Sequence, residues 1–285
     1  MDQRPICVFD SGMGGLTCVR QLIRLLPNEE LRYFGDTGRV PYGSRSAETI
    51  TKYARQDLAF LRTFGPKAVV IACGTVTTTA LDTLRAENDL PILGVVEPAA
   101  KKAAEISKNG RIGIVGTRAT IRTGAYERAI RALRPDAVIE SNACPLLVPL
   151  VEDGRVTEKD EITRMMIKEY FAPMKRANVD TIVLGCTHYP FLLPTLQKVA
   201  SQLAPDREIT FIDPAPAAAQ QLVRVMSARG ISLIDPGFIP VASPEDSTHP
   251  NFFPVAVPED STHPNIELHA SDSPESLQRI FALIS

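Results

Sequence analysis

The segment VVIACGTVTTTAL, residues 69–81, ends an apolar run on Cys73 and continues with a glycine and several threonines. The segment TIVLGCTHYPFLL, residues 181–193, repeats this plan around Cys186. A short apolar run bounded by glycine is typical of a buried strand, and helical spacing resumes after each cysteine. The two segments therefore predict two buried strands that each end on a thiol next to a helix start.

Strands and helices are predicted to alternate along most of the chain. The predicted strands span residues 6–9, 31–34, 67–72, 91–95, 111–115, 136–140, 180–184, 208–212 and about 266–269. The predicted helices span residues 16–26, 47–63, 76–87, 97–107, 122–133, 158–177, 189–203, 214–228 and 273–284. This alternation favours parallel sheets that are covered by helices on both faces.

Nine strands are many for one small sheet, and the two cysteine segments lie in similar settings. We therefore predict two doubly wound, mainly parallel α/β domains with the active site in the cleft between them. Residues 1–97 and 211–285 would form the first domain, so that the C-terminal segment returns to it, and residues 98–210 the second. Ligands of open α/β sheets bind beyond the carboxyl ends of the strands, where both cysteines are expected.

Composition excludes several classes of protein. The 285 residues are 44% hydrophobic and 22% charged, which is typical of a globular domain, and the net charge of −2 argues against a nucleic-acid or anionic-membrane surface. No apolar run reaches the length of a membrane span, and the N-terminus does not resemble a secretory signal. Five widely spaced cysteines without a CxxC pair fit reduced thiols in a cytoplasmic enzyme better than disulfides or zinc.

One segment is duplicated. PVASPEDSTHPN at residues 240–251 returns as PVAVPEDSTHPN at residues 254–265 with 11 of 12 positions identical. Two copies are too few for a solenoid, and the proline-rich, polar composition predicts a duplicated surface loop over residues 240–267. A metal site built from His249 and His263 is the alternative, and we favour the solvated loop.

The two thiols suggest acid–base chemistry. A cysteine at a strand end is most often a small buried hydrophobe, which is our interpretation of Cys7 and Cys18. Cys73 and Cys186 differ because a helix start favours the thiolate, and because His188 can exchange a proton with Cys186. One such site would suggest a nucleophile. Two in separate domains suggest acid–base thiols that face one carbon from opposite sides.

Other segments offer groups that could bind a ligand. In FDSGMGG, residues 9–15, Gly12, Gly14 and Gly15 open a helix whose amides could hold an anion. A dinucleotide site is a weaker alternative, because Thr17 stands where its fingerprint needs glycine, although Asp36 could imitate the ribose-binding acid. A small carboxylate is therefore the preferred ligand.

Three further segments carry polar side chains. The turn YFGDTGRVPYG, residues 33–43, brings Arg39 and Tyr42 close to Asp36 in sequence. Thr117 and Thr120 follow a strand, where their hydroxyls either cap a helix or bind a ligand. Glu152 ends the apolar segment CPLLVPLVEDG, residues 144–154, as either an exposed acid or a partly buried proton carrier.

The motifs DSGMGG, YFGDTGRVPYG, CGT, CPLLVPLVEDG and LGCTHYP, in this order, resemble those of the cofactor-independent glutamate racemases. The resemblance covers residues 5 to 230 approximately and resumes in the final strand and helix. The wider aspartate/glutamate racemase superfamily shares the plan with two cysteines, and the long turn together with DSGMGG favours the glutamate branch.

The resemblance implies roles for individual residues. Cys73 would handle D-glutamate and Cys186 L-glutamate, with Asp10, Glu152 and His188 assisting proton transfer. The residues implied to bind substrate are Ser11, Pro41, Tyr42, Gly43, Gly74, Thr75, Thr117, Thr120 and Thr187. The family usually has asparagine after the first cysteine, and this chain has Gly74. We expect a hydroxyl of Thr75, Thr77 or Thr187, or a water, to replace the missing polar contact.

The resemblance also implies an activity. It is the racemisation of glutamate by two thiols, which supplies D-glutamate for peptidoglycan synthesis and thus serves the cell wall and cell shape. No pyridoxal-lysine or metal motif stands out in the sequence, so we expect no cofactor and no metal. We also expect a homodimer, glutamate as the small-molecule partner and neither nucleic acid nor membrane as a partner. The alternatives are a racemase of another acidic or modified amino acid and a non-catalytic binding relative.

Overall fold

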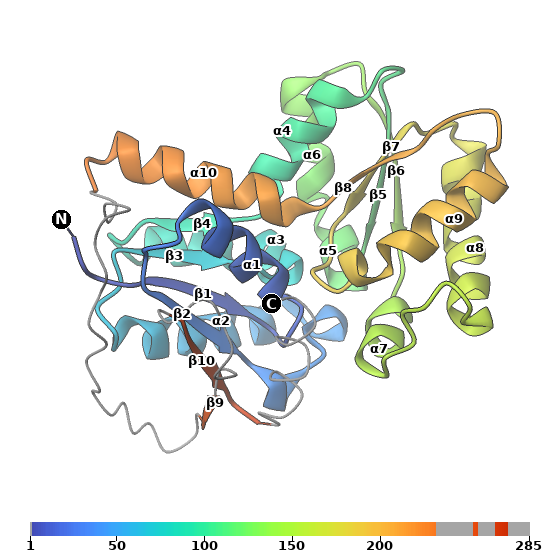
Figure 1. Cartoon of the computed structure of the whole chain (residues 1–285). Coiled ribbons are helices and arrows are strands. Elements are labelled where there is room, and N and C mark those ends of the chain that lie inside the picture. Colours follow the sequence, from blue (N-terminus) through green and yellow to red (C-terminus); the bar gives the residue numbers. More distant parts are fainter. Residues whose placement is uncertain (1, 232–252, 256–265, 273–285) are drawn as a thin grey trace.

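The chain forms two lobes, and each is built on its own sheet (Figure 1). The structure is a computed structural model and describes residues 2–231, 253–255 and 266–272. The first sheet has the strand order β4-β3-β1-β2-β10-β9 and the second β6-β5-β7-β8. All strand pairs are parallel except β9 with β10. The predicted fold class is confirmed.

The strands are β1 (Ile6–Asp10), β2 (Leu31–Gly35), β3 (Ala68–Ile71), β4 (Ile92–Gly94), β5 (Arg111–Gly116), β6 (Val138–Ala143), β7 (Thr181–Leu184), β8 (Thr210–Ile212), β9 (Phe253–Val255) and β10 (Ile266–Ala270). The α-helices are α1 (Leu16–Leu25), α2 (Ala47–Arg62), α3 (Gly74–Ala86), α4 (Val96–Ile106), α5 (Arg118–Thr123), α6 (Ala125–Leu133), α7 (Leu147–Glu152), α8 (Glu161–Arg176), α9 (Leu193–Leu203) and α10 (Pro214–Ala228). Three short 3₁₀ helices are η1 (Thr37–Arg39), η2 (Tyr42–Ser44) and η3 (Tyr189–Leu192).

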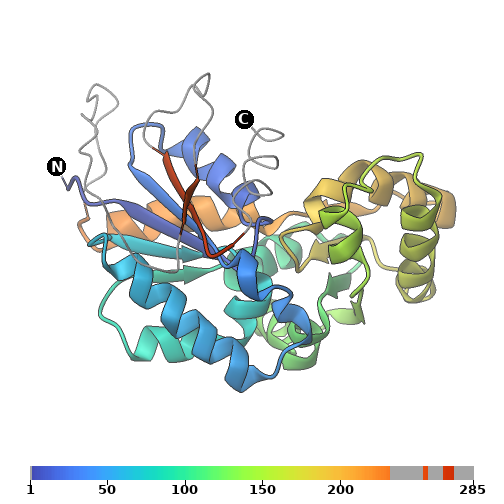
Figure 2. The same ribbon diagram turned by 90° about the horizontal axis from the view of Figure 1, so that it is seen from below.

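The first sheet is apolar on both faces, which explains the uninterrupted hydrophobic run of β1. Ile6 and Val8 pack with α1 and α10, whereas Cys7 and Phe9 pack with α2 and α3. In Figure 2 the light-blue α2 and the orange α10 lie on opposite sides of this sheet. Side chains of a strand alternate between the two faces, so a parallel strand between two helical layers must be apolar throughout.

The second sheet repeats this construction. On β5, Ile112 and Ile114 face α4 and α6, while Val115 faces the side of α7, α8 and α9. On β7, Val183 faces α4 and α6, and Leu184 faces the side of α7, α8 and α9. Each lobe therefore has its own pair of hydrophobic layers. No helix in the described residues is both long enough and apolar enough to cross a membrane.

The chain crosses between the lobes twice. It leaves the first sheet after β4 and returns after β8, which pairs with β7 up to Ile212. Both connecting helices touch both lobes, because α4 contacts α3 as well as α6 and β7, and α10 contacts α4 as well as α1. The domain boundaries at residues 97 and 210 stay a prediction.

Some helices differ from the sequence-based expectation. The predicted helix over residues 122–133 is two helices, α5 and α6, which are separated by Gly124 at φ 63°. A left-handed glycine is a common helix terminator. The predicted helix over residues 158–177 begins only at Glu161, because the Asp160 side chain caps it by accepting a hydrogen bond from the Thr163 amide.

The C-terminal segment returns to the first sheet. β10 pairs in parallel with β2, and β9 pairs antiparallel with β10 at the sheet edge. The predicted surface loop over residues 240–267 is thus wrong at residues 253–255 and 266–267, because β9 pairs the otherwise open edge of β10, where Pro254 is tolerated. The rest of that segment, with His249 and His263, and the predicted helix over residues 273–284 lie outside the described residues.

Glu267 fixes β10 to its neighbour β2. Its carboxylate forms an ion pair with Arg32 of β2, and His269 Nε2 lies 2.8 Å from Glu267 Oε1. The Arg32 guanidinium also stacks over the Phe64 ring, 4.7 Å from its centroid. The 14-residue unit that begins with the second copy, residues 254–267, therefore ends on a residue that contacts the sheet.

This difference predicts that the two copies are not equally dispensable. Excising residues 240–253 joins Ile239 to Pro254, so that Ile-Pro-Val replaces the Phe-Pro-Val of β9 and β10 stays complete. We expect this variant to keep the thermal unfolding midpoint of the parent, because the sequence predicts a surface loop over residues 240–252 and the length of such a loop changes folding free energy only weakly.

The matched variant lacks residues 254–267 and is shorter by the same 14 residues. It loses Glu267, whose half-buried ion pair is worth about 1–2 kcal/mol, between the values for exposed and buried pairs. Each kcal/mol lowers the midpoint by about 2–4 °C in a chain of this size. Equal midpoints for the two deletions, measured by calorimetry, would show that the Glu267 contact adds nothing.

Candidate active site

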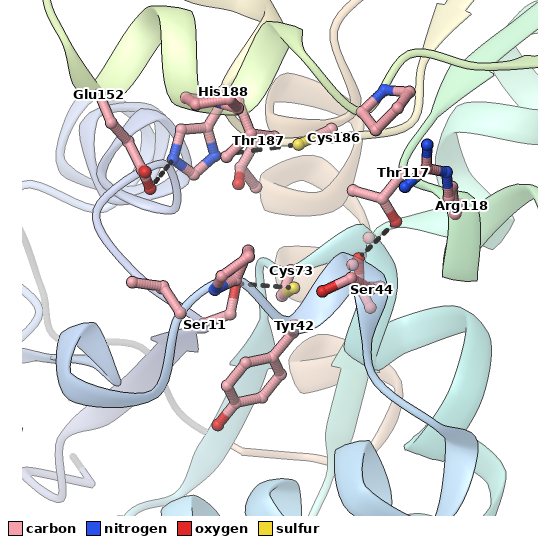
Figure 3. A pocket seen from close by; sticks show the side chains of 18 of the residues that line it. Ser11, Tyr42, Ser44, Cys73, Thr117, Arg118, Glu152, Cys186, Thr187 and His188 are labelled. Atoms are coloured by element: carbon pink, nitrogen blue, oxygen red, sulfur yellow. Dashed lines mark hydrogen bonds and ion pairs between the residues drawn. The ribbon is translucent and has the colours of Figure 1, made fainter.

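A cavity of about 350 Å³ lies between the lobes at the carboxyl ends of both sheets (Figure 3). Twelve of the fourteen predicted site residues line it: Ser11, Pro41, Tyr42, Gly43, Cys73, Gly74, Thr75, Thr117, Glu152, Cys186, Thr187 and His188. Asp10 and Thr120 are buried behind this lining. The structure thus brings the predicted residues together, while their individual roles stay a prediction.

Cys73 follows β3 and caps the start of α3. Its sulfur donates a hydrogen bond to Ser11 Oγ at 3.4 Å. Burial raises the pKa of the Cys73 thiol, and the Asp10 carboxylate raises it further, against the opposing effects of Ser11 and of the Val76 backbone amide. The expected lowering of its pKa by the helix start is therefore outweighed by desolvation. Cys73 is a proton donor in this structure.

Cys186 follows β7 and lies on the opposite wall of the cavity (Figure 3). Its sulfur is 3.8 Å from His188 Nδ1, and His188 Nε2 is 3.3 Å from Glu152 Oε1. Burial disfavours a charged His188, but contacts with Cys186 and Glu152 overcome this cost and raise the pKa of His188 to about 10. The imidazole therefore holds its proton at neutral pH and is placed to exchange it with the Cys186 sulfur.

Asp10 links the two lobes beneath the cavity. Its side chain is fully buried, and its Oδ2 accepts hydrogen bonds from the Gly15 amide at 2.7 Å and from Thr187 Oγ1 at 3.2 Å. Oδ1 has no hydrogen-bond partner within the described residues. The carboxylate lies close enough to Cys73 to raise the pKa of its thiol. Asp10 can therefore influence both the position of Thr187 and the proton on Cys73.

Three threonine hydroxyls form hydrogen bonds across the interface between the lobes. Thr75 Oγ1 lies 2.9 Å from Thr117 Oγ1 and 3.4 Å from Thr120 Oγ1. Thr117 also caps α5, because its hydroxyl accepts a hydrogen bond from the Thr120 amide. The interpretation of Thr117 as a helix cap is thus confirmed, and its position in the cavity lining leaves ligand binding as a prediction. Thr77 instead donates to the Ile71 carbonyl and lies outside the lining.

Asp36 lies beneath the cavity wall and does not line the cavity. It is fully buried, and it accepts hydrogen bonds from Tyr42 Oη and Ser271 Oγ and pairs with Arg39. The weaker interpretation of Asp36 as a ribose-binding acid is therefore wrong, because its oxygens are already used inside the protein.

The sequence interpretation missed seven lining residues: Val40, Ser44, Arg118, Pro145, Leu146, Val148 and Pro149. The apolar ones on and before α7 looked like ordinary core, and no sequence signal separates a cavity wall from a core. Arg118 had a signal, because it directly follows Thr117 at a predicted strand end. Arg118 is exposed and is the only Lys or Arg among the described residues that line the cavity.

Glycines let the lobes approach closely. A Cβ atom on Gly74 would lie 2.3 Å from the Gly185 carbonyl oxygen, and one on Gly14 would lie 2.4 Å from Thr187 Oγ1. A Cβ on Gly43 would lie 2.6 Å from Thr117 Cβ. Real side chains almost never come so near to other atoms, and at Gly74 the obstacle is backbone that cannot rotate away.

The sequence is similar to those of known proteins. A family model described as Asp/Glu/Hydantoin racemase matches residues 13–222. The glutamate racemase of Geobacter metallireducens is 39% identical over 236 residues, which cover 83% of this chain and 84% of that protein. That of Chlorobaculum tepidum is 43% identical over 228 residues, covering 80% and 81%.

Solved structures are similar over most of the chain. The glutamate racemase from Francisella tularensis in complex with D-glutamate has a TM-score of 0.81 at 29% identity, covering 100% of this chain and 94% of that one. The isoform RacE1 from Bacillus anthracis has a TM-score of 0.77 at 35% identity, covering 82% and 85%.

The contact at Gly74 predicts the effect of adding a side chain there. Gly74→Asn introduces the asparagine that the sequence resemblance implies after the first cysteine, but its Cβ meets the Gly185 carbonyl. Overpacking of this kind costs about 1–3 kcal/mol. We expect this cost to fall on the close arrangement of the lobes that binds substrate, so the KM for glutamate, the substrate that the resemblance implies, should rise about tenfold.

Gly74→Ala is the matched control, since it adds the Cβ without the carboxamide. Alanine should raise KM as much as asparagine does, although it favours the helix intrinsically. Tighter glutamate binding by Gly74→Asn than by the parent would instead show that a polar contact is missing at this position.

Proposed function

Because the chain belongs to the Asp/Glu/hydantoin racemase family, we propose that it interconverts L-glutamate and D-glutamate without a cofactor. The observation that carries the proposal is that Cys73 and Cys186, from different lobes, line opposite walls of one cavity. Inversion of a carbon requires removal of a proton from one face and addition of a proton to the other. One residue cannot occupy both faces, but two lobes can supply one thiol each.

The proposed reaction conserves protons. Starting from L-glutamate, the Cys186 thiolate takes the α-proton and becomes a thiol, while the electron pair stays on the α-carbon. The Cys73 thiol then gives its proton to the opposite face, which yields D-glutamate and a Cys73 thiolate. The reverse reaction exchanges the two roles. The His188–Glu152 pair would assist at Cys186 through the contacts described above, and Asp10 would assist at Cys73 through its charge, which raises the pKa of that thiol.

The α-proton of an amino acid is very weakly acidic, so the site must stabilise the developing carbanion. The starts of α3 and α5 lie at the cavity, where their backbone amides and positive dipole ends favour negative charge. Arg118 adds a cation at the rim, which suits a substrate with two carboxylates. Apolar residues such as Leu146 and Val148 help to exclude water when substrate is held.

The wider role is part of the same proposal. D-Glutamate would enter peptidoglycan synthesis in the cytoplasm, and the enzyme would thereby serve cell-wall biogenesis and cell shape. We further propose that it acts as a homodimer. The support for these statements is membership of the family together with the implications of the sequence motifs. A racemase of another acidic or modified amino acid is the second candidate, which Gly74 favours because it changes the usual site.

Isotope exchange tests the activity most simply. Either enantiomer of glutamate, incubated with the enzyme in deuterium oxide, should acquire deuterium at the α-carbon and approach an equal mixture of enantiomers. Proton NMR follows the exchange, and circular dichroism follows the racemisation. A panel that includes aspartate and glutamine distinguishes the second candidate. Glutamate that remains fully protonated and optically pure would contradict the proposal.

Serine substitutions separate the two thiols. Cys73→Ser and Cys186→Ser should each abolish net racemisation, because a hydroxyl is far too weak an acid to replace a thiol at neutral pH. Elimination of halide from a β-halogenated glutamate needs only one base. Cys73→Ser should therefore retain elimination from the L enantiomer, and Cys186→Ser from the D enantiomer.

The two variants serve as controls for each other, since each retains one intact wall of the cavity. Halide release is measured for both enantiomers with both variants. Equal activity of one variant toward both enantiomers would rule out the assignment of one face to each thiol.

A further inference from the structure

A buried polar cluster supports the cavity wall that carries Tyr42. Tyr42 is one of the residues that line the cavity, and its hydroxyl points into the first lobe toward Asp36 and Asp57. Both carboxylates have fully buried side chains. Arg39 lies against both of them, with Nε 2.5 Å from Asp36 Oδ2 and a terminal nitrogen 2.6 Å from Asp57 Oδ1.

The hydrogen-bond count of this cluster requires one additional proton. Tyr42 Oη is hydrogen-bonded to Asp36 Oδ2 and lies 3.1 Å from Asp57 Oδ2. A phenol has a single proton and can donate to only one carboxylate oxygen at a time. The second contact is attractive only if the other carboxyl group carries a proton and donates it to the phenol oxygen.

The charge balance also indicates that one of the two carboxyl groups carries a proton. Arg39 brings one positive charge to two buried carboxylates, and a buried uncompensated negative charge is costly. Among the described residues, the titratable and charged groups that face Asp57 are Asp36, Arg39 and Tyr42. One proton on a carboxyl group makes the cluster neutral.

The surroundings of the two carboxyl groups decide which one holds the proton. Asp36 receives three donors, from Tyr42, from Arg39 and from Ser271 Oγ at 2.7 Å. Asp57 receives one cationic donor, from Arg39 at Oδ1, and its Oδ2 has only the longer 3.1 Å contact with Tyr42 Oη. More donors favour the ionised form. We propose that Asp57 is a positioning residue for the racemase reaction, which donates the proton of its carboxylic acid to Tyr42 Oη while Tyr42 donates to an ionised Asp36.

Electrostatics agree with this assignment. Burial raises the pKa of Asp57 well above its usual value of 3.8, and the charge of Asp36 raises it further, against the effects of Arg39 and the Tyr42 hydrogen bond. The folded protein therefore binds this proton more tightly than the unfolded chain does. Its contribution to stability is greatest at low pH and decreases as the pH rises above 3.8 toward the folded pKa.

The protonated cluster holds the wall of the cavity in place. Tyr53 packs against the Tyr42 ring with centroids 5.4 Å apart, and the Arg39 guanidinium lies 4.4 Å from the Tyr53 ring centroid. The neighbouring Gly43 lies directly against Thr117 of the other lobe. Removal of the Asp57 proton would set two carboxylates against the phenol oxygen and displace this wall, so that substrate binds more weakly at alkaline pH.

The same chemical change at the two carboxyl groups tests the proposal. Asp57→Asn keeps a neutral group that can donate to Tyr42 and accept from Arg39, so KM for glutamate should change by less than about threefold. Asp36→Asn removes the anion that compensates Arg39, and KM should rise about tenfold or more. The kcat of Asp57→Asn should stay near that of the parent, because Asp57 touches no reacting atom.

The pH profile separates a proton-holding role from simple packing. The ratio of the parent's KM to that of Asp57→Asn should rise with alkaline pH, because every other titrating group is common to both proteins. A ratio that is constant with pH would overturn the proposal, as would equal losses in Asp57→Asn and Asp36→Asn.

An infrared measurement tests the proton without using activity, whereas the kinetic test rests on the proposed function. With ¹³C-labelled aspartate, the difference spectrum between the parent and Asp57→Asn at neutral pH should contain a protonated-carboxyl band. Absence of this band would refute the proton on Asp57. The result does not depend on whether the enzyme racemises glutamate. This comparison also decides the question if Asp36→Asn fails to fold.

Discussion

Backbone contact between Gly74 and Gly185 sets the distance between the two lobes. No side-chain atom fits between these residues, and Gly14 and Gly43 allow similar approaches elsewhere along the same interface. The other features of the site depend on this closeness. The Asp10–Thr187 and Thr75–Thr117 hydrogen bonds both cross the interface, and the two cysteines can face one small cavity only because the sheets end so near to each other.

The two thiols have different surroundings although their positions in the fold are alike. Cys73 lies next to a carboxylate and in a desolvated pocket, which keeps it protonated, whereas Cys186 lies next to an imidazole that holds a proton. A two-base racemisation needs one acid and one base at any moment, so unequal environments serve the reaction better than equal ones. The Asp36–Asp57 cluster applies the same principle to the wall of the cavity, where unequal hydrogen bonding separates two neighbouring carboxyl groups.

The sequence was sufficient for the strands and the thiols because they are encoded locally. An apolar run such as that of β1 or β3 specifies a strand between two helical layers, and the carboxyl ends of parallel strands converge. Contacts between residues that are far apart along the chain could not be predicted from the sequence. Nothing near Asp57, which lies in an ordinary amphipathic helix, indicates that it meets Tyr42. The cavity-facing side of α7 looks like core, and the pairing of β9 with β10 depends on an edge that only the folded sheet presents.

The central claim is that Cys73 and Cys186 act on one carbon from opposite faces. A crystal structure of the enzyme with bound glutamate measures this directly. The account predicts that the α-carbon lies about 3–3.5 Å from each sulfur, with the two sulfurs on opposite sides of the plane of its other substituents and about 6–8 Å apart. An α-carbon in contact with only one of the sulfurs, or with both on the same face, would contradict it.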